Sequence, residues 1–574
     1  MTTESLALAR TPHPWGVLRL RQYFSARHLG VGWQVASLAL VLAVLVPLQS
    51  LLGHAMRGSG ELWPHLLSYV LPQALQDSAL LLLGVGVLVI ALGSSLAWLV
   101  SAYDFVGRRE LSWALLLPLA IPSYIIAFAY LDLWHPVGIL QSSLRTLLGF
   151  DSPRDFKLPD IRSMWGCILL LGLVLYPYVY LPVRAVFSMQ AGNLIEAART
   201  LQAGPQRIFF GLALPLARPA IAVGTSLALM EALNDLGASE FLGVRTLTVS
   251  IYSTWLNRSN LPGAAQIALL MLCIVLALIS IERWARRHQR YTLATRRMQP
   301  LARRRLTGWR GVLALTYCSL PITLGFVMPA GYLVGETYKR LRFSGLESSL
   351  LSELLNTLQL ATATTLLAAL LAFLLSFAQR MARTPLNRQI LRCASLGYAI
   401  PGTVLAIGLL GPLAQFDAWI NRLFELSGHA PIGLLLSGSS VALIYAYLVR
   451  FLAIANGSLE AGFSQLPTSL DDAARTLGSS PTRLAWRIHL PLCRPALLSA
   501  MLLVFVDSMK ELPATLLLRP MNFETLATHL YGEAARGTYE SGAIAALLIV
   551  LAGLLPIIAL SRLAERRDSH GSSP

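Results

Sequence analysis

Two stretches of the chain, EAARTLQAGPQRIFFGLALPLARPAI at 196–221 and DAARTLGSSPTRLAWRIHLPLCRPAL at 472–497, align without a gap at a constant offset of 276 residues. The same offset continues into the next apolar segment, where it pairs Glu231 with Asp507 and Asp235 with Glu511. Self-similarity at a fixed spacing indicates internal copies of one structural unit. We therefore expect the chain to consist of two equivalent halves.

The composition places these halves in a membrane. Of the 574 residues, 55% are hydrophobic and only 13% are charged, with a mean hydropathy of +0.60. A water-soluble protein of this size would expose far more charge. The formal net charge of +17 comes from arginines in short segments between long apolar runs. This is the pattern of the positive-inside rule, so we expect a lipid bilayer and no nucleic acid as partner.

Twelve apolar stretches are long enough to cross the bilayer, because a spanning helix needs about 20 residues. We expect an all-α, polytopic protein of about 12 transmembrane helices in two parallel six-helix repeats, since an even number of spans gives both copies the same direction. The expected spans are 33–53, 79–102, 113–133, 164–186, 217–236 and 264–282, then 311–333, 357–379, 391–412, 433–455, 494–511 and 541–562. Pro122 and Pro401 fall in matching third spans, where each would act as a hinge or as a packing kink.

Arginine placement predicts the orientation. Arginines cluster in alternate loops, which are therefore expected to face the cytoplasm together with both termini. The opposite loops, such as DSPRDFKLPDIR at 151–162 and FDAWINRLFELSGH at 416–429, mix both signs and are expected outside. We expect a first repeat over 1–283, a basic cytoplasmic linker over 284–310 and a second repeat over 311–574. The N-terminal 30 residues contain no apolar stretch of signal-peptide length.

The repeated stretch itself lies in cytoplasmic loops at about 188–215 and 464–491, and each copy is expected to form helix, break and helix. An acid–arginine pair opens each copy, adjacent alanines follow, and Gly and Pro mark the break and the end. These residues are Glu196, Ala197, Ala198, Arg199, Gly204 and Pro215, then Asp472, Ala473, Ala474, Arg475, Gly478 and Pro491. One copy alone would fit an ordinary amphipathic loop. Two copies at matching positions favour a docking surface for a two-fold partner.

This element resembles the EAA motif of permeases in binding-protein-dependent ABC importers of the type I, methionine-permease-like fold. The resemblance implies that each copy is a coupling helix for one ATPase subunit, so two ATPase copies are expected. It also implies a periplasmic substrate-binding protein and a bacterial inner membrane. Two departures stand out: Gln202 occupies the usual Gly position, and Asp472 replaces the usual Glu.

The chain is not expected to hydrolyse ATP. A P-loop requires Gly-Lys-Ser/Thr, and none of its three lysines follows a glycine: Lys157, Lys339 and Lys510. The ATP would then be used by a separate subunit, with no cofactor bound by this chain. Its cysteines show no CxxC spacing and its histidines no ligand spacing, so no permanent metal centre is expected.

Ionisable residues inside the fifth span of each half form the candidate translocation path or gate. They are Glu231, Asn234 and Asp235 in the first half and Asp507, Lys510 and Glu511 in the second. Each charge at the bilayer centre costs about 2.5–3.5 kcal/mol, so they should line the interface between the halves. Hard carboxylate oxygens would suit transient Fe(III) ligation. Alternatively, the acids form a gate in which Lys510 neutralises Asp507 or Glu511.

The wider resemblance is to fused two-repeat permeases of ferric-iron importers, through MEALNDLGASEFLGVRTLTVSIYSTW from Met230 and FVDSMKELPATLLLRPMNFETLATHLY from Phe505. It implies Fe3+ as substrate, with thiamine, phosphonate or polyamine as alternatives for related fused permeases. An ion-coupled secondary transporter also has twelve helices in two halves, but it has no need of matched coupling elements. The chain shows no catalytic His, Cys or Ser constellation that would favour a membrane enzyme.

Overall fold

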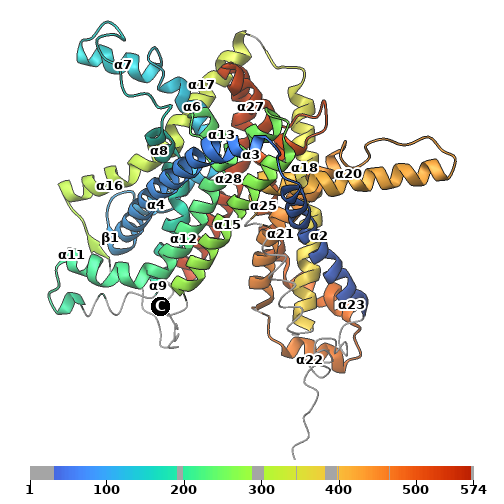
Figure 1. Cartoon of the computed structure of the whole chain (residues 1–574). Helices are drawn as coiled ribbons and strands as arrows, with labels where there is room; N and C mark the ends of the chain where they lie inside the picture. The colour runs from blue at the N-terminus through green and yellow to red at the C-terminus, as the bar shows by residue number, and fades with distance from the viewer. Residues whose placement is uncertain are drawn as a thin grey trace, which may run out of the picture.

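A computed structural model describes residues 31–189, 195, 198–286, 303–343, 345–381, 397, 400–464 and 466–570. Within these ranges the chain is helical apart from loops and one pair of two-residue strands (Figure 1). The strands β1 (Tyr103–Asp104) and β2 (Arg304–Arg305) pair in parallel and join the first half to the start of the second. The all-α prediction is confirmed.

The helices of the two halves follow one another in the same order. In the first half they are α2 (Val31–Met56), α3 (Leu62–His65), η1 (Leu66–Val70), α4 (Leu71–Ala102), α5 (Arg108–Ala114), η2 (Leu117–Ala120), α6 (Ser123–Leu133), α7 (Ile139–Leu148), α8 (Met164–Leu175), α9 (Pro177–Met189), α11 (Pro205–Ile208), η3 (Phe209–Ala213), α12 (Leu214–Asn234), α13 (Gly237–Phe241), α14 (Leu247–Leu256) and α15 (Leu261–Arg286). In the second half they are α16 (Trp309–Ile322), η4 (Thr323–Val327), α17 (Met328–Phe343), α18 (Leu350–Met381), α20 (Gly402–Leu426), α21 (Ser440–Ser464), α22 (Ser469–Thr476), α23 (Pro481–Leu484), η6 (Ala485–His489), α24 (Leu490–Leu492), α25 (Arg494–Met509), α26 (Pro513–Leu518), α27 (Leu526–Arg536) and α28 (Tyr539–His570).

The described residues contain eight helices that are long and apolar enough to cross a membrane, or up to eleven if three bent helix pairs each count as one span. A shorter apolar helix, Leu42–Met56, lies within α2. Each of the twelve predicted stretches overlaps one of these segments. The chain is therefore a multi-span membrane protein, and the sequence located its spans correctly while underestimating the length of several of them.

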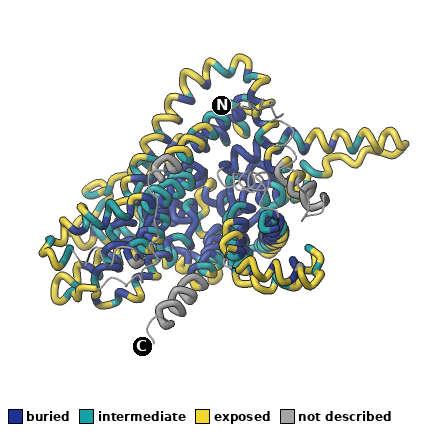
Figure 2. The backbone as a smooth tube through the Cα atoms, turned by 90° about the horizontal axis from the view of Figure 1, so that it is seen from below, coloured by how far each residue is buried: buried dark blue, intermediate teal, exposed yellow. Residues whose placement is uncertain are grey.

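The third span of the second half differs most from the prediction. Residues 391–396 lie outside the described residues, and α20 continues as helix through Leu426, although 416–429 was expected to be a loop. The prediction was wrong because no glycine or proline interrupts the chain between Pro412 and Gly428, where the backbone takes φ +77° and the helix ends. The far end of α20 projects from the bundle and is largely exposed, whereas buried residues fill the interior (Figures 1 and 2).

Each half has a core of three long helices at equivalent positions. In the first half α4, α9 and α12 pack on one another, and in the second α18, α21 and α25 do the same. Glycines allow the close approach in the first core. A Cβ on Gly93 would lie 2.6 Å from the Val179 side chain, and one on Gly224 would lie 2.4 Å from the Tyr178 carbonyl. Small residues at helix crossings let spans meet closely where the hydrophobic effect gives no drive.

The halves exchange their first helices. α2 packs against α20 of the second half as well as against α15, and α17 packs against α6 of the first half as well as against α28. The α2–α20 crossing is tight, since a Cβ on Gly408 would lie 2.3 Å from the Pro47 carbonyl oxygen. Each of the two hydrophobic cores consequently contains side chains from both halves.

Pro122 and Pro401 lie immediately before α6 and α20 rather than within a continuous helix. The segments Arg108–Ala120 and Ser123–Leu133, on either side of Pro122, meet at 90°. Both prolines are extended, with ψ of 148° and 144°, as expected of a residue that caps a helix. They mark breaks at which short helix turns point into the centre of the protein.

Candidate translocation site and coupling elements

A cavity of about 120 Å³ lies where α12 and α25 end between the two halves. All six predicted path residues line it: Glu231, Asn234, Asp235, Asp507, Lys510 and Glu511. The breaks before α6 and α13 also contribute to the wall, through Pro122, Ser123 and Gly237. The structure thus brings together polar groups from both repeats that are more than 270 residues apart in sequence.

Asp235 occupies the point at which α12 stops. Its carboxylate accepts hydrogen bonds from the backbone N–H of Ser239 at 2.8 Å and from the Ser239 hydroxyl at 3.0 Å, and also from the Ser123 hydroxyl. A carboxylate at this place satisfies the free N–H groups that begin α13 and complements the positive end of the helix. Asp235 is only 7% exposed. It joins α12, α13 and the start of α6.

Glu511 does the same work in the second half, since position 511 is position 235 plus 276. Its carboxylate accepts hydrogen bonds from the backbone N–H groups of Ala514 and Thr515, both at 3.2 Å, and from the Thr515 hydroxyl at 3.0 Å. Thr515 is the counterpart of Ser239 at the same offset. Two of the four acids therefore have their oxygens committed to capping short helices.

Arg450 of α21 completes the second carboxylate and was not predicted as a site residue. Its guanidinium Nη1 donates to Glu511 Oε1 at 2.7 Å, and the two side chains are 10% and 1% exposed. The available signal was a lone arginine in the apolar tenth span, LIYAYLVRFLAIA. Position 174, which is 276 residues earlier, is Val174, and it lines the same cavity. The charged pair is thus a departure from the symmetry of the halves.

Lys510 and Asp507 form a second ion pair, with 2.8 Å between Lys510 Nζ and Asp507 Oδ1. Their side chains are 31% and 25% exposed, so this pair is more accessible than the Arg450–Glu511 pair. The position aligned with Lys510 is Asn234, whose side-chain oxygen accepts the backbone N–H of Gly402 at 2.9 Å. Asn234 therefore fastens the end of α12 to the start of α20, whereas Lys510 neutralises an acid.

The cavity chemistry bears on metal ligation. Among the residues that the structure describes, no three His, Cys, Asp or Glu side chains converge as a metal site. Asp235 and Glu511 are capping groups, and Asp507 bonds to Lys510. An entering cation would have to replace these contacts, whereas ion pairs that break and re-form fit a gate between the halves.

The second predicted coupling element is described almost completely. α22 holds Asp472 and Ala473 exposed and Ala474 buried, so only one of the two alanines faces outward. Arg475 is helical, but its side chain lies outside the described residues. Gly478, at φ +74°, ends the helix, and Ser480 caps the next one by accepting the backbone N–H of Arg483. Pro491 sits in the first turn of α24, before a 76° bend that leads to α25.

The first element has the same local structure as far as it is described. Glu196 and Ala197 lie outside the described residues, while Ala198 and Arg199 are helical and partly exposed. The helix ends in a Schellman motif: the N–H of Ala203 donates to the Ala198 carbonyl and that of Gln202 to the Arg199 carbonyl, both at 3.0 Å. Gly204 then precedes α11, and Pro215 lies in the first turn of α12, which continues without a sharp bend.

Gln202 takes the left-handed conformation, φ +59°, that Gly478 takes in the second element. A side chain in this region costs roughly 1–2 kcal/mol, which explains why glycine suits the position. We expect Gln202→Gly to stabilise the protein by about 0.5–1 kcal/mol after the greater freedom of unfolded glycine is subtracted. Gly478→Ala should destabilise it by about 1 kcal/mol, because nothing lies within 4 Å of the added Cβ and only the backbone term remains. Thermal unfolding of the two purified variants measures both effects, and shifts of the same sign would contradict this assignment.

A buried polar network anchors the second element. Asp471 accepts from Arg380 Nε of α18 at 2.7 Å and lies 2.7 Å from His489 Nε2 of η6. Arg380 also donates to the carbonyls of Phe463 and Leu466, at 2.8 and 3.1 Å. The first element has apolar residues at the aligned places: Ile195 for Asp471 and Ala213 for His489, both fully buried. The two elements are therefore held to their halves by different forces.

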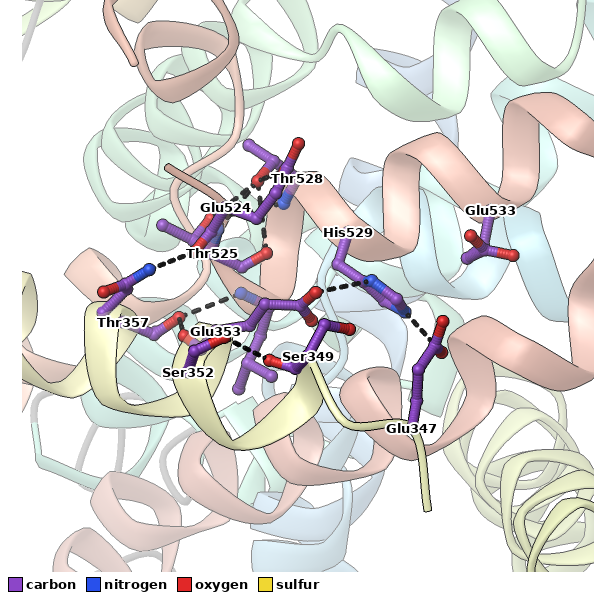
Figure 3. A network of polar contacts seen from close by, with 12 residues as sticks. Glu347, Ser349, Ser352, Glu353, Thr357, Glu524, Thr525, Thr528, His529 and Glu533 are labelled. Carbon is purple, nitrogen blue, oxygen red and sulfur yellow. Dashed lines mark hydrogen bonds and ion pairs between the residues drawn. The ribbon is translucent and has the colours of Figure 1, made fainter. Parts of the chain in front are cut away.

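At the end of the bundle away from α22, His529 of α27 forms the centre of another network (Figures 1 and 3). Its Nδ1 lies 3.1 Å from Glu353 of α18, and its Nε2 lies 3.9 Å from Glu347. Figure 3 shows the imidazole between these two acids, with Glu533 on the same helix as His529. Burial disfavours the imidazolium, but the hydrogen bond and charge of Glu353, followed by the charges of Glu347 and Glu533, raise the pKa of His529 above its usual 6.5.

This network predicts a pH-dependent stability. Because the folded pKa of His529 is raised, the contact stabilises the protein fully below about pH 6.5 and is lost as the pH rises through the folded pKa. The arginines near these acids, Arg340 beside Glu347 and Arg536 beside Glu533, stay charged throughout. We expect the wild type to lose about 1–2 kcal/mol more than His529→Gln between pH 6 and pH 9. Unfolding midpoints that run parallel across this range would refute the assignment.

Comparisons with known proteins match this architecture. A family model described as "Binding-protein-dependent transport system inner membrane component" matches residues 89–291 and again 364–569, once in each half. The chain is 26% identical over 86% of its length to a Haemophilus influenzae protein named Fe(3+)-transport system permease protein FbpB 2, of which 90% is covered. It is 31% identical over 43% of its length to a Salmonella choleraesuis protein named as a putative 2-aminoethylphosphonate transport system permease, of which 89% is covered. It is 28% identical over 34% of its length to the Escherichia coli molybdenum transport system permease protein ModB, of which 86% is covered.

Proposed function

Because the chain belongs to the family of binding-protein-dependent transport system inner membrane components, we propose that it forms the membrane path of an ATP-driven importer of ferric iron. A periplasmic binding protein would deliver the iron, and a separate ABC ATPase would supply the work. The observation that carries the choice of iron is the match with the Fe(3+)-transport relative along 86% of this chain.

The extent of the matches favours iron over the other cargoes. The relatives named for 2-aminoethylphosphonate and molybdenum match only 43% and 34% of this chain, about the length of one repeat, although most of each relative is covered. The Fe(3+)-transport relative corresponds to both repeats in one polypeptide. A phosphonate is the second candidate, because the identity of that relative is higher, at 31%.

The coupling elements are proposed to dock one ATPase subunit each. Leu201 and Leu477, which align at the 276-residue offset, end the two coupling helices and are 82% and 85% exposed. Large apolar side chains left this exposed at matching places suit a partner surface better than solvent. The acids and alanines that precede them, Asp472 and Ala473 in the second copy, would complete the contact.

The six path residues are proposed to form a gate rather than a set of iron ligands. Asp235 and Glu511 would hold the short helices α13 and α26 against the ends of α12 and α25. The Lys510–Asp507 pair and Glu231 would face the cargo at the cavity wall. Rocking of one half against the other would separate these groups and open the cavity to each side in turn.

The placement in the membrane follows from the arginine-rich loops. We place both termini, the coupling elements and the linker at 284–310 in the cytoplasm of a bacterium, with repeats over 1–283 and 311–574. The loops around α7 and the far end of α20 would then face the binding protein on the outside. In this arrangement the His529 network lies on the outer face and the Arg380–Asp471–His489 network on the inner face.

The test is transport by the assembled system. The chain, its ATPase and its binding protein are reconstituted in proteoliposomes, with the binding protein loaded with 55Fe(III), 2-aminoethylphosphonate or molybdate. We expect ATP-dependent accumulation of iron alone. Accumulation of either anion without iron would overturn the iron assignment while leaving the ATP-driven importer in place.

The same vesicles separate the importer from an ion-coupled carrier. Collapsing the membrane potential while ATP remains should leave uptake unchanged in an ATP-driven importer. Uptake that needs the potential and continues without ATP would overturn the importer itself. A variant with Glu231→Gln and Asp507→Asn further separates the gate from the ligand role, because only loss of a ligand set would change the preference for iron over other cations.

A further inference from the structure

A second cavity, of about 410 Å³, lies where the start of α16 passes the end of α4. Its wall is mainly apolar and aromatic and includes Trp98, Phe209, Leu306, Leu313 and Tyr317. The Ser95 and Tyr317 hydroxyls are hydrogen-bonded at 2.6 Å and join α4 to α16 inside it. Trp98 and Phe209 pack with their ring centroids 5.6 Å apart. The cavity opens to the surface among exposed apolar residues of α16, such as Trp309 and Leu313.

Basic side chains surround one end of this cavity. Arg310 contributes to its wall, with the guanidinium 5.7 Å from the centre of the Trp309 ring. Arg304 and Arg305 directly precede Leu306, a wall residue, and all three arginines are exposed. Strand pairing holds this segment in place, because the N–H of Leu306 donates to the Asp104 carbonyl at 2.8 Å. The nearby Asp104 carboxylate bonds to Arg108 at 3.1 Å and so does not neutralise the arginines fully.

We propose that this cavity is a binding site for an anionic phospholipid. An acyl chain would lie along Trp98, Leu313 and Tyr317, and the phosphate would lie at Arg304, Arg305 and Arg310. The lining belongs to helices of membrane-spanning length, Leu62–Ala102 and Trp309–Phe343, so lipid is the molecule that surrounds it. The charge selects the class of lipid, because arginines close to the membrane surface favour anionic over zwitterionic headgroups. The aromatic rings are typical of the boundary between headgroups and acyl chains.

The site touches the first coupling element. Phe209 opens the π-helical turn η3, which leads from α11 into α12. A lipid packed on Phe209 would therefore stiffen the route from the coupling helix to the translocation cavity. The aligned position in the second element is Ala485, which is fully buried and offers no aromatic surface. The lipid would act on one half only, in which the Asp471–His489 anchor of the other half is absent.

Lipid binding is measured on the purified full-length chain by native mass spectrometry. Phosphatidylglycerol and phosphatidylcholine with identical palmitoyl and oleoyl chains are titrated separately, with inorganic phosphate as a third arm. We expect phosphatidylglycerol to be retained with a preference of roughly tenfold or more, from the three arginines. Inorganic phosphate alone should not bind, because it lacks the acyl chains.

Two variants test the two parts of the site. Arg304→Ala/Arg305→Ala/Arg310→Ala should lower the preference to about twofold or less, whereas the control triple Arg162→Ala/Arg342→Ala/Arg422→Ala removes three exposed arginines elsewhere and should retain it. Leu313→Trp, at a side chain 56% exposed, should fill the cavity and weaken binding of both lipids without altering charge. Equal retention of the two lipids by the wild type would overturn the proposal, as would an equal loss in the control triple. Phosphate binding that competes with phosphatidylglycerol would show an anion site without a lipid.

Discussion

Arg450→Val is expected to abolish ATP-driven uptake and to destabilise the protein by about 3–5 kcal/mol, because it leaves the Glu511 carboxylate buried without its cation. Valine is the residue that the first half carries at the aligned position 174, so the substitution restores the symmetry of the halves in size but not in charge. Glu511 also caps α26, and a displaced Glu511 side chain would release Ala514 and Thr515. The fifth span of the second half would then lose its fixed end at the cavity.

The second substitution in this pair is Glu511→Gln combined with Arg450→Val. The neutral amide keeps an acceptor for the N–H groups of α26 and removes the unpaired charge, so most of the lost stability should return. Uptake should stay low if the ion pair is part of the gate. Lys510→Asn, which copies Asn234, is the matched control at a more exposed pair and should cost about 1 kcal/mol or less. Uptake of 55Fe(III) and the unfolding midpoint are measured together, and wild-type uptake by Arg450→Val would exclude the pair from the gate.

Leu201→Asp combined with Leu477→Asp is expected to lower ATP-driven uptake by a factor of about ten or more while leaving the fold unchanged. Both side chains are more than 80% exposed, so their contribution to folding is small and the unfolding free energy should change by about 0.5 kcal/mol or less. At a docked surface each aspartate would instead place a charge against apolar groups of the ATPase. The measurements are uptake and the stimulation of ATP hydrolysis by the reconstituted chain.

Val106→Asp is the matched control for the leucine pair. Val106 is 84% exposed in the loop between β1 and α5, which the arginine pattern places on the same side of the membrane but outside the coupling elements. It should leave both uptake and ATP hydrolysis near the wild-type values. If the double leucine variant behaves like Val106→Asp, the coupling elements do not carry the contact. If either single leucine variant abolishes uptake completely, the two elements do not share the work equally.

The sequence predicted the features that depend on composition and on local pattern. Long apolar runs marked the spans, and the 276-residue offset marked the repeat, because both are written in consecutive residues. The six polar residues near the ends of α12 and α25 could be placed together, since charges inside spans must face one another. Gly478 was predicted at a helix break, which its left-handed backbone explains.

Other features depend on contacts between distant residues and could not be predicted. The roles of Asp235 and Glu511 as helix caps require α13 and α26 to follow the break, and those helices are too short to show a periodic pattern. Arg450 was visible as a lone charge, but its partner lies 61 positions away on another helix. The extension of α20 to Leu426 was missed because its polar residues resemble a loop when their helical spacing is ignored.

The repeat also concealed differences between its copies. The aligned positions of Asp471 and His489 hold Ile195 and Ala213, so alignment alone predicted equal elements where the structure has one polar and one apolar anchor. Gln202 in the place of glycine was a visible departure, and the structure shows that it changes the backbone energy rather than the backbone shape.

The crossing of α2 onto α20 and of α17 onto α6 has a consequence for how the polypeptide could be divided. A cut between the two repeats would produce fragments that each lack one wall of their own bundle and expose the seat of the other fragment's leading helix. Such fragments should be unstable when made singly and should recover a working importer when made in the same cell. Joining them in one gene product guarantees that each is always synthesised beside the only partner able to cover it.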